Sequence, residues 1–279
     1  MIIANTIQEV RAHVYGWKKY HTIGFVPTMG YLHEGHLSLI ERSVAENAKT
    51  IVSIFVNPMQ FSPTEDLDKY PRDLESDKAM CRKAGANLIF YPQVEEIYPK
   101  DFYSYVDMEG LTKELCGKTR ANHFRGVCTV VNKLFNIVAA DRAYFGQKDA
   151  QQLAVIKKMV RDLNMDIEII GCPIIREVDG LAKSSRNSYL SLEERKAAQV
   201  VSQAIFKGEE LVKSGEISAK NIIESMTKIV QTEPLAKIDY IEIVDLDTLE
   251  KIQEVTKPTL GAVAIYIGKT RLIDNFAVY

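Results

Sequence analysis

Two histidines mark the stretch of this sequence most suited to chemistry, residues 25–36. A short apolar run bounded by Gly24 and Pro27 leads into it, and apolar residues at helical spacing follow His36, so the pattern predicts a strand, a loop and a helix. The first amide groups of a helix lack partners within the helix, and the aligned peptide dipoles add about half a positive charge there. The junction therefore suits a phosphate, which Gly35 allows close to the backbone.

His33 and His36 are three residues apart, so both rings lie on one side of the helix entrance and can donate hydrogen bonds to a phosphoryl group. The alternatives are a surface pair or half of a zinc site. No cysteine is close by, and the five histidines lack the paired spacing of structural zinc ligands. The spacing also differs from the Glu-containing helix motif of metalloproteases. Spacing alone leaves phosphate binding and the surface pair open.

Further polar groups follow other predicted strands. Gln60 stands after the β-branched run 50–56, at the type of strand end where parallel sheets bind ligands, although it could be an ordinary loop glutamine. The segment 120–126 places two arginines and His123 just before a predicted helix, which suits a phosphate or a carboxylate, or is a solvated basic loop. Both stretches are candidate anion or substrate sites.

Two more segments could bind a nucleotide. Residues 146–149, Gly-Gln-Lys-Asp, form a second strand-loop-helix junction, where Lys148 supplies a mobile charge and Asp149 either accepts from ribose hydroxyls or caps the helix. Residues 183–186, Lys-Ser-Ser-Arg, offer two cations and two hydroxyls to a triphosphate. Most such tetrads are exposed loops, but a basic loop fits a nucleotide that loses pyrophosphate.

The elements that must position these groups alternate in the way of an α/β protein. Strands are predicted at 22–26, 50–56, 87–91, 142–145 and 166–170, with helices at 6–19, 36–48, 73–84, 127–139 and 149–163. Residues 92–119 are poorly periodic and predict a β-hairpin or flap. Helices at 191–213 and 218–232 and strands at 238–244, 262–267 and 271–278 follow. We expect a doubly wound, Rossmann-like parallel sheet of about five strands in domain 1–175 and a smaller α+β lid domain at 176–279.

Composition narrows the class of protein. The 279 residues are 46% hydrophobic, which provides ample core material, and 35 basic residues nearly cancel 37 acidic ones. Dispersed charge argues against nucleic acid as a partner. No apolar run reaches the roughly 20 residues that span a bilayer. Four scattered cysteines favour a reduced chain, so we expect a cytoplasmic protein without a membrane partner.

Motifs spread over nearly the whole chain resemble those of the pantothenate synthetase (pantoate–β-alanine ligase) family. His-x-Gly-His alone would indicate only the wider nucleotidyltransferase superfamily, whereas the ordered set is far more specific. The matching stretches are Pro27-Thr28-Met29-Gly30 with His33-Glu34-Gly35-His36, Phe55-Val56-Asn57-Pro58-Met59-Gln60-Phe61, Glu65-Asp66-Leu67 with Tyr70-Pro71-Arg72, His123-Phe124-Arg125-Gly126-Val127, Tyr144-Phe145-Gly146-Gln147-Lys148-Asp149, Gln151-Gln152-Leu153 and Asp179-Gly180-Leu181-Ala182-Lys183-Ser184-Ser185-Arg186-Asn187.

The resemblance implies an AMP-forming ligase of coenzyme A precursor biosynthesis. It adenylates pantoate with ATP, releases pyrophosphate, and transfers the pantoyl group to β-alanine. The implied catalytic residues are His36, His33 and Lys148. The implied ATP-binding residues are Pro27, Thr28, Met29, Gly30, Gly35, Gly146, Gln147, Asp149, Ile175, Lys183, Ser184, Ser185 and Arg186. Pantoate and β-alanine are implied to contact Gln60, Gln152, Tyr70, Arg120 and His123.

The resemblance also implies a homodimer and Mg²⁺ that arrives with ATP, held by phosphates and water without a protein metal site. Tyr31, Gln147, Cys116, Asn122 and Lys183 depart from the family pattern. We hypothesise that Lys183 adds phosphate affinity and that Tyr31 narrows the nucleotide cleft. The rival functions are a plain nucleotidyltransferase, which would not need Gln60 and Gln152, and a nucleotide-binding regulatory protein without turnover.

Overall fold

The computed structural model describes residues 1–63, 65, 67–256 and 258–279, so Asp66 of the motif around Glu65 lies outside it. The chain forms two compact units. The first consists of Met1–Met108, Arg120–Gln147 and Val155–Pro173; the second consists of Glu109–Thr119, Lys148–Ala154 and Ile174–Tyr279. The second unit therefore takes two segments from within residues 1–175.

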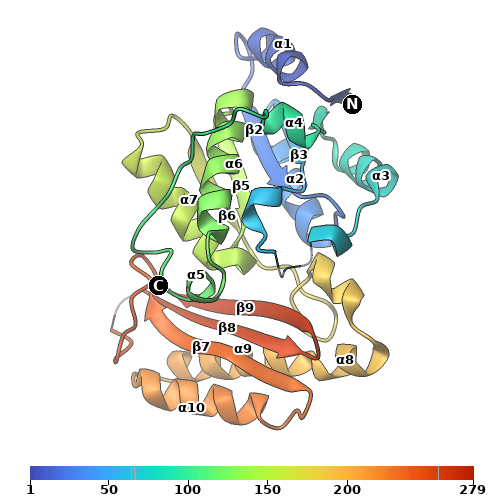
Figure 1. Cartoon of the computed structure of the whole chain (residues 1–279). Helices are drawn as coiled ribbons and strands as arrows, with labels where there is room; N and C mark the ends of the chain where they lie inside the picture. Colours follow the sequence, from blue (N-terminus) through green and yellow to red (C-terminus); the bar gives the residue numbers. More distant parts are fainter. Residues whose placement is uncertain (64, 66, 257) are drawn as a thin grey trace. The chain divides into compact units, whose positions relative to one another are not determined.

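A parallel sheet forms the centre of the first unit (Figure 1). In the described residues it has six strands, β1 (Ile2–Ala4), β2 (Ile23–Thr28), β3 (Lys49–Ile54), β4 (Leu88–Phe90), β5 (Arg142–Gly146) and β6 (Glu168–Cys172). Their order is β1-β4-β3-β2-β5-β6, and every pair is parallel. The order reverses between β2 and β5, and ligands of doubly wound sheets bind outside the strand ends at such a point.

The helices associated with this sheet are α1 (Ile7–Trp17), α2 (Glu34–Glu46), α3 (Leu74–Ala84), α4 (Val94–Ile97), α6 (His123–Val138) and α7 (Ala150–Asp162). Alternate residues of β2 divide the core. Val26 packs in the cluster that includes α2 and α3, whereas the Phe25 ring meets Phe135 of α6 at 6.4 Å. Both side chains are fully buried, as period-2 alternation requires of a strand covered on two faces. The predicted doubly wound fold is confirmed.

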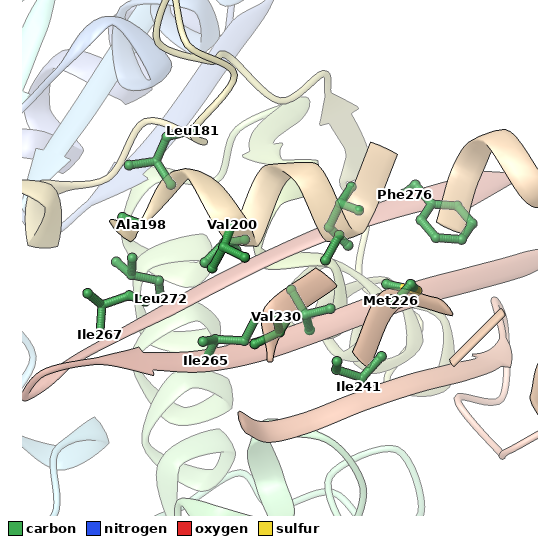
Figure 2. Packing of buried hydrophobic residues seen from close by; sticks show 14 of the residues in the cluster. Leu181, Ala198, Val200, Met226, Val230, Ile241, Ile265, Ile267, Leu272 and Phe276 are labelled. Atoms are coloured by element: carbon green, nitrogen blue, oxygen red, sulfur yellow. The ribbon is translucent and has the colours of Figure 1, made fainter. Parts of the chain in front are cut away.

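The second unit contains a three-stranded antiparallel sheet of β7 (Ala236–Asp245), β8 (Thr259–Ile267) and β9 (Thr270–Val278). Helices α9 (Gln199–Lys213) and α10 (Ala219–Val230) pack against it, with α8 (Leu192–Ala197) before them and the short α5 (Cys116–Thr119) in the same unit. Figure 2 shows their core, in which Val200, Met226, Ile265 and Phe276 are buried. The predicted α+β composition of this region is confirmed.

Several local predictions are wrong for identifiable reasons. The sheet has a sixth strand, β1, which at three residues is too short to show periodicity. Residues 92–119 contain α4 and α5, and no strand is formed by this segment in the described structure. Helix α6 starts at His123, four residues early, so His123 and Arg125 lie in its first turn. The predicted helix 191–213 is two helices, α8 and α9.

Candidate active site

The two histidines of the His-x-Gly-His motif cap helix α2. His33 is the N-cap residue, and its Nδ1 accepts the Gly35 N–H at 3.1 Å, while the Nδ1 of His36 accepts the His33 N–H at 3.2 Å. This is a capping box built from two imidazoles in place of the usual hydroxyl and carboxylate. The N–H groups of His33 and Gly35, which were predicted to be available to a phosphate, therefore bind side chains in this structure.

The cap fixes the proton positions of both rings. An Nδ1 that accepts a hydrogen bond carries no proton, so each neutral imidazole has its N–H at Nε2. The ring centroids are 4.1 Å apart, which confirms that both rings lie on one side of the helix entrance. The pair can thus direct two Nε2–H donors to an anion at the carboxyl end of β2.

The loop before His33 is fixed from two sides. The Thr28 hydroxyl donates to the Ser53 carbonyl at 2.7 Å and accepts the Gly30 N–H at 3.2 Å.

A cavity of about 140 Å³ lies at the carboxyl ends of β2, β3 and β4, and its lining includes Met29, Tyr31 and Asp77. Burial raises the pKa of Asp77, against the effect of the N–H groups of Leu32 and Tyr31 that it accepts. Pro27 and Thr28 are the last residues of β2.

Gln60 lies in a buried amide network at the end of β3. It ends the short 3-10 helix Pro58–Gln60 and is 9% exposed. Its Nε2 donates to the Met29 sulfur at 3.0 Å, and its Oε1 accepts from Asn57 Nδ2 at 3.1 Å. Asn57 is held in turn by the Tyr98 hydroxyl at 2.9 Å and by the Gly126 carbonyl at 3.1 Å. Gln60 and Met29, which are both predicted site residues, are therefore in contact.

Arg120 and His123 support the backbone of Gln60. Arg120 Nε donates to Glu65 Oε1 at 2.5 Å, and its Nη1 donates to His123 Nε2 at 2.9 Å. A guanidinium cannot accept, so His123 must carry its proton on Nδ1, which donates to the Gln60 carbonyl at 2.9 Å. Although burial acts to raise the pKa of Glu65, the Arg120 and Ser62 hydrogen bonds hold it below its usual range. Tyr70, also buried, meets the Phe61 ring at 6.0 Å.

Lys148 comes shortly after β5 in the chain and belongs to the second unit. Its Nζ is 3.8 Å from Asp149 Oδ1, and its backbone carbonyl accepts from Asn275 Nδ2 at 2.9 Å. The two glutamines after it differ in environment. Gln151 is buried and binds the Leu111, Glu114 and Cys116 backbone, whereas its neighbour Gln152 is half-buried. Gln151 is thus structural, and the predicted substrate residue is the more accessible of the pair.

The basic loop is a fixed turn of the second unit. Arg176 pairs across a bridge with Ala182 and donates to both oxygens of buried Asp274, at 2.6 and 3.0 Å. The Ile175 carbonyl accepts the Lys183 N–H at 2.9 Å, and Lys183 Nζ is 3.0 Å from Glu177 Oε2. Ser184 caps the 3-10 helix Ser185–Tyr189, which contains Arg186. The Glu177 carboxylate therefore competes with any anion for the charge of Lys183.

Asp179 fastens this loop to α8 and α9 and gives it a pH dependence. Arg195 donates to both its oxygens at 2.7 and 3.0 Å and, with Gln199, lowers its pKa to about 2. Because the pKa is lower in the folded state, the ionised carboxylate stabilises the protein above the unfolded pKa of 3.8. This stabilisation is lost as the pH falls through about 2. We expect Asp179→Asn to lower the unfolding free energy by about 1 kcal/mol at pH 7, after solvent screening, and by much less near pH 2. Denaturant unfolding at both pH values measures this; an equal loss at both would contradict it.

The predicted site residues thus fall into two groups. Met29, His33, His36, Gln60, Tyr70, Arg120 and His123 belong to the first unit with Gly146 and Gln147, the end of β5 and the residue after it. Lys148, Asp149, Gln152, Ile175 and residues 183–186 belong to the second. No role was predicted for four residues that support the site. Asn57 binds Gln60 and Glu65 binds Arg120, whereas Tyr98 binds Asn57 and Asp274 binds Arg176 of the basic loop. Asn57 and Glu65 stand in quoted motifs, which was the available signal.

No group of three or more His, Cys, Asp or Glu side chains suited to a metal ion occurs among the described residues. Nor does any helix in the described part of the chain have the length and hydropathy to cross a membrane. A doubly wound sheet with polar side chains at the ends of its strands beside the switch point is the arrangement of nucleotide-binding α/β proteins.

Comparisons with known proteins specify the class. The family model for pantoate-beta-alanine ligase matches residues 2–277. Pantothenate synthetase of Ruminiclostridium cellulolyticum is 60% identical over 274 residues, 98% of this chain and 97% of the relative, and that of Enterococcus faecalis is 57% identical over 277 residues, 99% and 98%. A pantothenate synthetase structure from Thermus thermophilus has a TM-score of 0.95 at 45% identity and covers 100% of both chains.

A structure of pantoate-beta-alanine ligase from Francisella tularensis, complexed with beta-gamma ATP and β-alanine, has a TM-score of 0.80 at 35% identity. The match covers 99% of this chain and 97% of that one. The chain belongs to the pantoate–β-alanine ligase family. The resemblance read from the motifs and the predicted ligase class are confirmed.

Proposed function

We propose that this chain condenses pantoate with β-alanine at the expense of ATP, in coenzyme A precursor biosynthesis, and that the residues of its two units act as follows. Family membership over residues 2–277 is the observation that carries the reaction. The Francisella relative, solved with beta-gamma ATP and β-alanine, supports both as substrates here. Pantoate follows from the family description.

The reaction has two steps. An oxygen of the pantoate carboxylate attacks the α-phosphorus of ATP, and the bond to pyrophosphate breaks, which leaves pantoyl adenylate. The β-alanine amine then attacks the pantoyl carbonyl carbon, loses a proton, and expels AMP. A free carboxylate is a poor acyl donor, whereas an adenylate has a good leaving group. The protein therefore mainly aligns the reactants and neutralises charge.

The histidine pair is proposed to bind the phosphates of ATP. The observation behind this is the shared cap, which leaves both rings with an Nε2–H and sets their centroids 4.1 Å apart. His36 acts as proton donor or as a hydrogen-bond donor to the α-phosphate in the transition state. Lys148 stabilises the transferring phosphoryl group, and Ser184, Ser185 and Arg186 close on the β and γ groups. The nucleotide is lined by Pro27, Thr28, Met29, Gly30, Gly35, Gly146, Gln147, Asp149 and Ile175.

Gln60 and Gln152 are proposed to bind pantoate, with Gln60 also near β-alanine and Tyr70 beside the acid. Arg120 and His123 contribute by holding Gln60: the guanidinium fixes the His123 tautomer, and His123 Nδ1–H fixes the Gln60 carbonyl. Mg²⁺ would be held by phosphate oxygens and water, where it neutralises charge on the β- and γ-phosphates.

Lys183→Met should raise the KM for ATP, by about three- to tenfold for loss of one charge–phosphate contact. The opposite change, Glu177→Gln, removes the carboxylate 3.0 Å from Lys183 Nζ and should lower that KM. Steady-state kinetics at saturating pantoate and β-alanine measure both. An unchanged KM in Lys183→Met would show that this lysine adds no phosphate affinity.

The test of the reaction is release of pyrophosphate and AMP from ATP and Mg²⁺ with D-pantoate, with and without β-alanine. Turnover that needs both acids and yields pantothenate supports the ligase. Pyrophosphate release with a phosphorylated acceptor and neither acid would favour the nucleotidyltransferase. ATP binding without any product would favour the regulatory protein.

Assembly and compartment are also proposals. A homodimer follows from the family resemblance, and sedimentation equilibrium at micromolar protein tests it: a mass of one chain would contradict it. A cytoplasmic location is supported by the state of Cys81, Cys116, Cys128 and Cys172, all free thiols. The domain roles, with residues 1–175 binding ATP and pantoate and 176–279 acting as a lid, are proposed on the family resemblance; the second unit also includes Lys148–Ala154 from within the first range.

A further inference from the structure

Asp77, on helix α3, holds the turn that precedes the histidine pair. Its carboxylate is buried, with a residue exposure of 2%. Oδ1 accepts the Leu32 N–H at 2.7 Å, and Oδ2 accepts the Tyr31 N–H at 2.9 Å. Two successive backbone N–H groups converging on one anion form the kind of concave site that binds phosphates elsewhere. Here an internal carboxylate is the anion.

The turn has a backbone conformation that needs such support. Gly30 has φ +84° and Tyr31 has φ +50°, so two consecutive residues are left-handed, and a tyrosine rarely adopts that region. The turn also closes tightly over the carboxylate. A Cβ added to Gly30 would lie 3.0 Å from Asp77 Oδ2 and 2.9 Å from the Ile54 side chain. Glycine is required there for both reasons.

The position of the turn gives Asp77 its influence. Immediately before it is Met29, whose sulfur accepts from Gln60, and His33 begins the cap of α2 two residues after Tyr31. The path of the Gly30-Tyr31 turn therefore sets where the His33 and His36 rings lie.

We propose that Asp77 is a positioning residue for ATP: its carboxylate holds the Gly30-Tyr31 turn left-handed, so that the His33 and His36 donors meet the phosphates. The inference rests on the proposed phosphate role of the two histidines. Because a displacement of about 1 Å can cost about 100-fold in rate, a small change in this turn is sufficient to matter.

The test is Asp77→Asn, which keeps the shape but has one acceptor oxygen for two N–H groups. We expect kcat/KM for ATP to fall about 10- to 100-fold, with the KM for pantoate within about threefold of wild type, at a temperature where circular dichroism shows a fully folded protein. Asp141→Asn is the matched control. Its carboxylate accepts the Ile23 N–H at 2.6 Å at the opposite end of β2, so it should lower the unfolding temperature and leave ATP kinetics unchanged.

A double variant tests whether Asp77 acts through the turn. Glycine adopts left-handed angles without steric cost, so in a Tyr31→Gly background the Asp77→Asn loss should shrink to less than about threefold. Fully additive losses, or a folded Asp77→Asn protein with wild-type ATP kinetics, would overturn the inference. His36→Ala separates the two proposals. If it impairs ATP use while Asp77→Asn does not, only the Asp77 role fails; if it has no effect, the phosphate assignment fails and the Asp77 role with it.

Discussion

His36→Ala should lower kcat/KM for ATP by about 100- to 1,000-fold, because it removes a preorganised donor aimed at charge that develops during phosphoryl transfer. This is about 3 to 4 kcal/mol of transition-state stabilisation. The same substitution also removes the acceptor of the His33 N–H, at 3.2 Å, so the unfolding free energy should fall by about 1 kcal/mol. Initial-rate kinetics and thermal unfolding measure the two effects.

His36→Gln separates catalysis from capping. A glutamine at this third helical position can still accept the N-cap N–H, as in an ordinary capping box, but its amide cannot reproduce the imidazole Nε2–H position. We expect an unfolding midpoint close to that of wild type together with most of the activity loss. His21→Ala, at an exposed histidine outside the motif, should change neither quantity. Near-normal activity in folded His36→Gln would mean that the histidine serves the helix rather than the reaction.

Local patterns were sufficient for the elements that are long and regularly covered. The β-branched run 50–56 identified β3, and the alternation of Phe25 and Val26 follows from burial on two faces. Segment 92–119 could not be predicted in this way, because its position depends on distant partners. Val106 donates to the Thr129 hydroxyl, and Gln151 binds the Leu111 and Glu114 carbonyls. Helix α6 starts early, after Asn122, which is left-handed and makes no side-chain cap hydrogen bond.

The candidate site also has a part that the sequence predicts and a part that only the fold shows. Residues that stand at strand ends, such as Gln60 and Lys148, are visible in sequence because polar groups rarely interrupt buried runs without a role. What orients them is not visible, since Glu65, Arg120 and His123 reach Gln60 only through the fold. The sequence also contains two adjacent glutamines, Gln151 and Gln152, as candidates for substrate binding. Only the structure shows that Gln151 is bound to backbone groups and that Gln152 is more accessible.

Lys148→Met should reduce kcat by about 100-fold or more while changing the KM for ATP by less than about threefold. Its Nζ is 3.8 Å from the half-exposed carboxylate of Asp149, and so long a contact contributes only about 0 to 1 kcal/mol. Its backbone, in contrast, is held by Asn275 at 2.9 Å. A lysine whose backbone is fixed and whose ammonium group is weakly held suits a contact that forms as the α-phosphorus is attacked. Only contacts that strengthen in the transition state raise kcat.

Lys157→Met, at an exposed lysine of the following helix α7, is the matched control and should leave both constants unchanged. The split between kcat and KM decides how Lys148 works. A raised KM with normal kcat would mean that Lys148 binds ATP equally well in the ground state and the transition state, so that the charge stabilising phosphoryl transfer must come from the histidine pair or the basic loop. A fall in kcat alone would mean that Lys148 contacts the phosphates mainly in the transition state, and Asp149→Asn should then impair turnover less than Lys148→Met does.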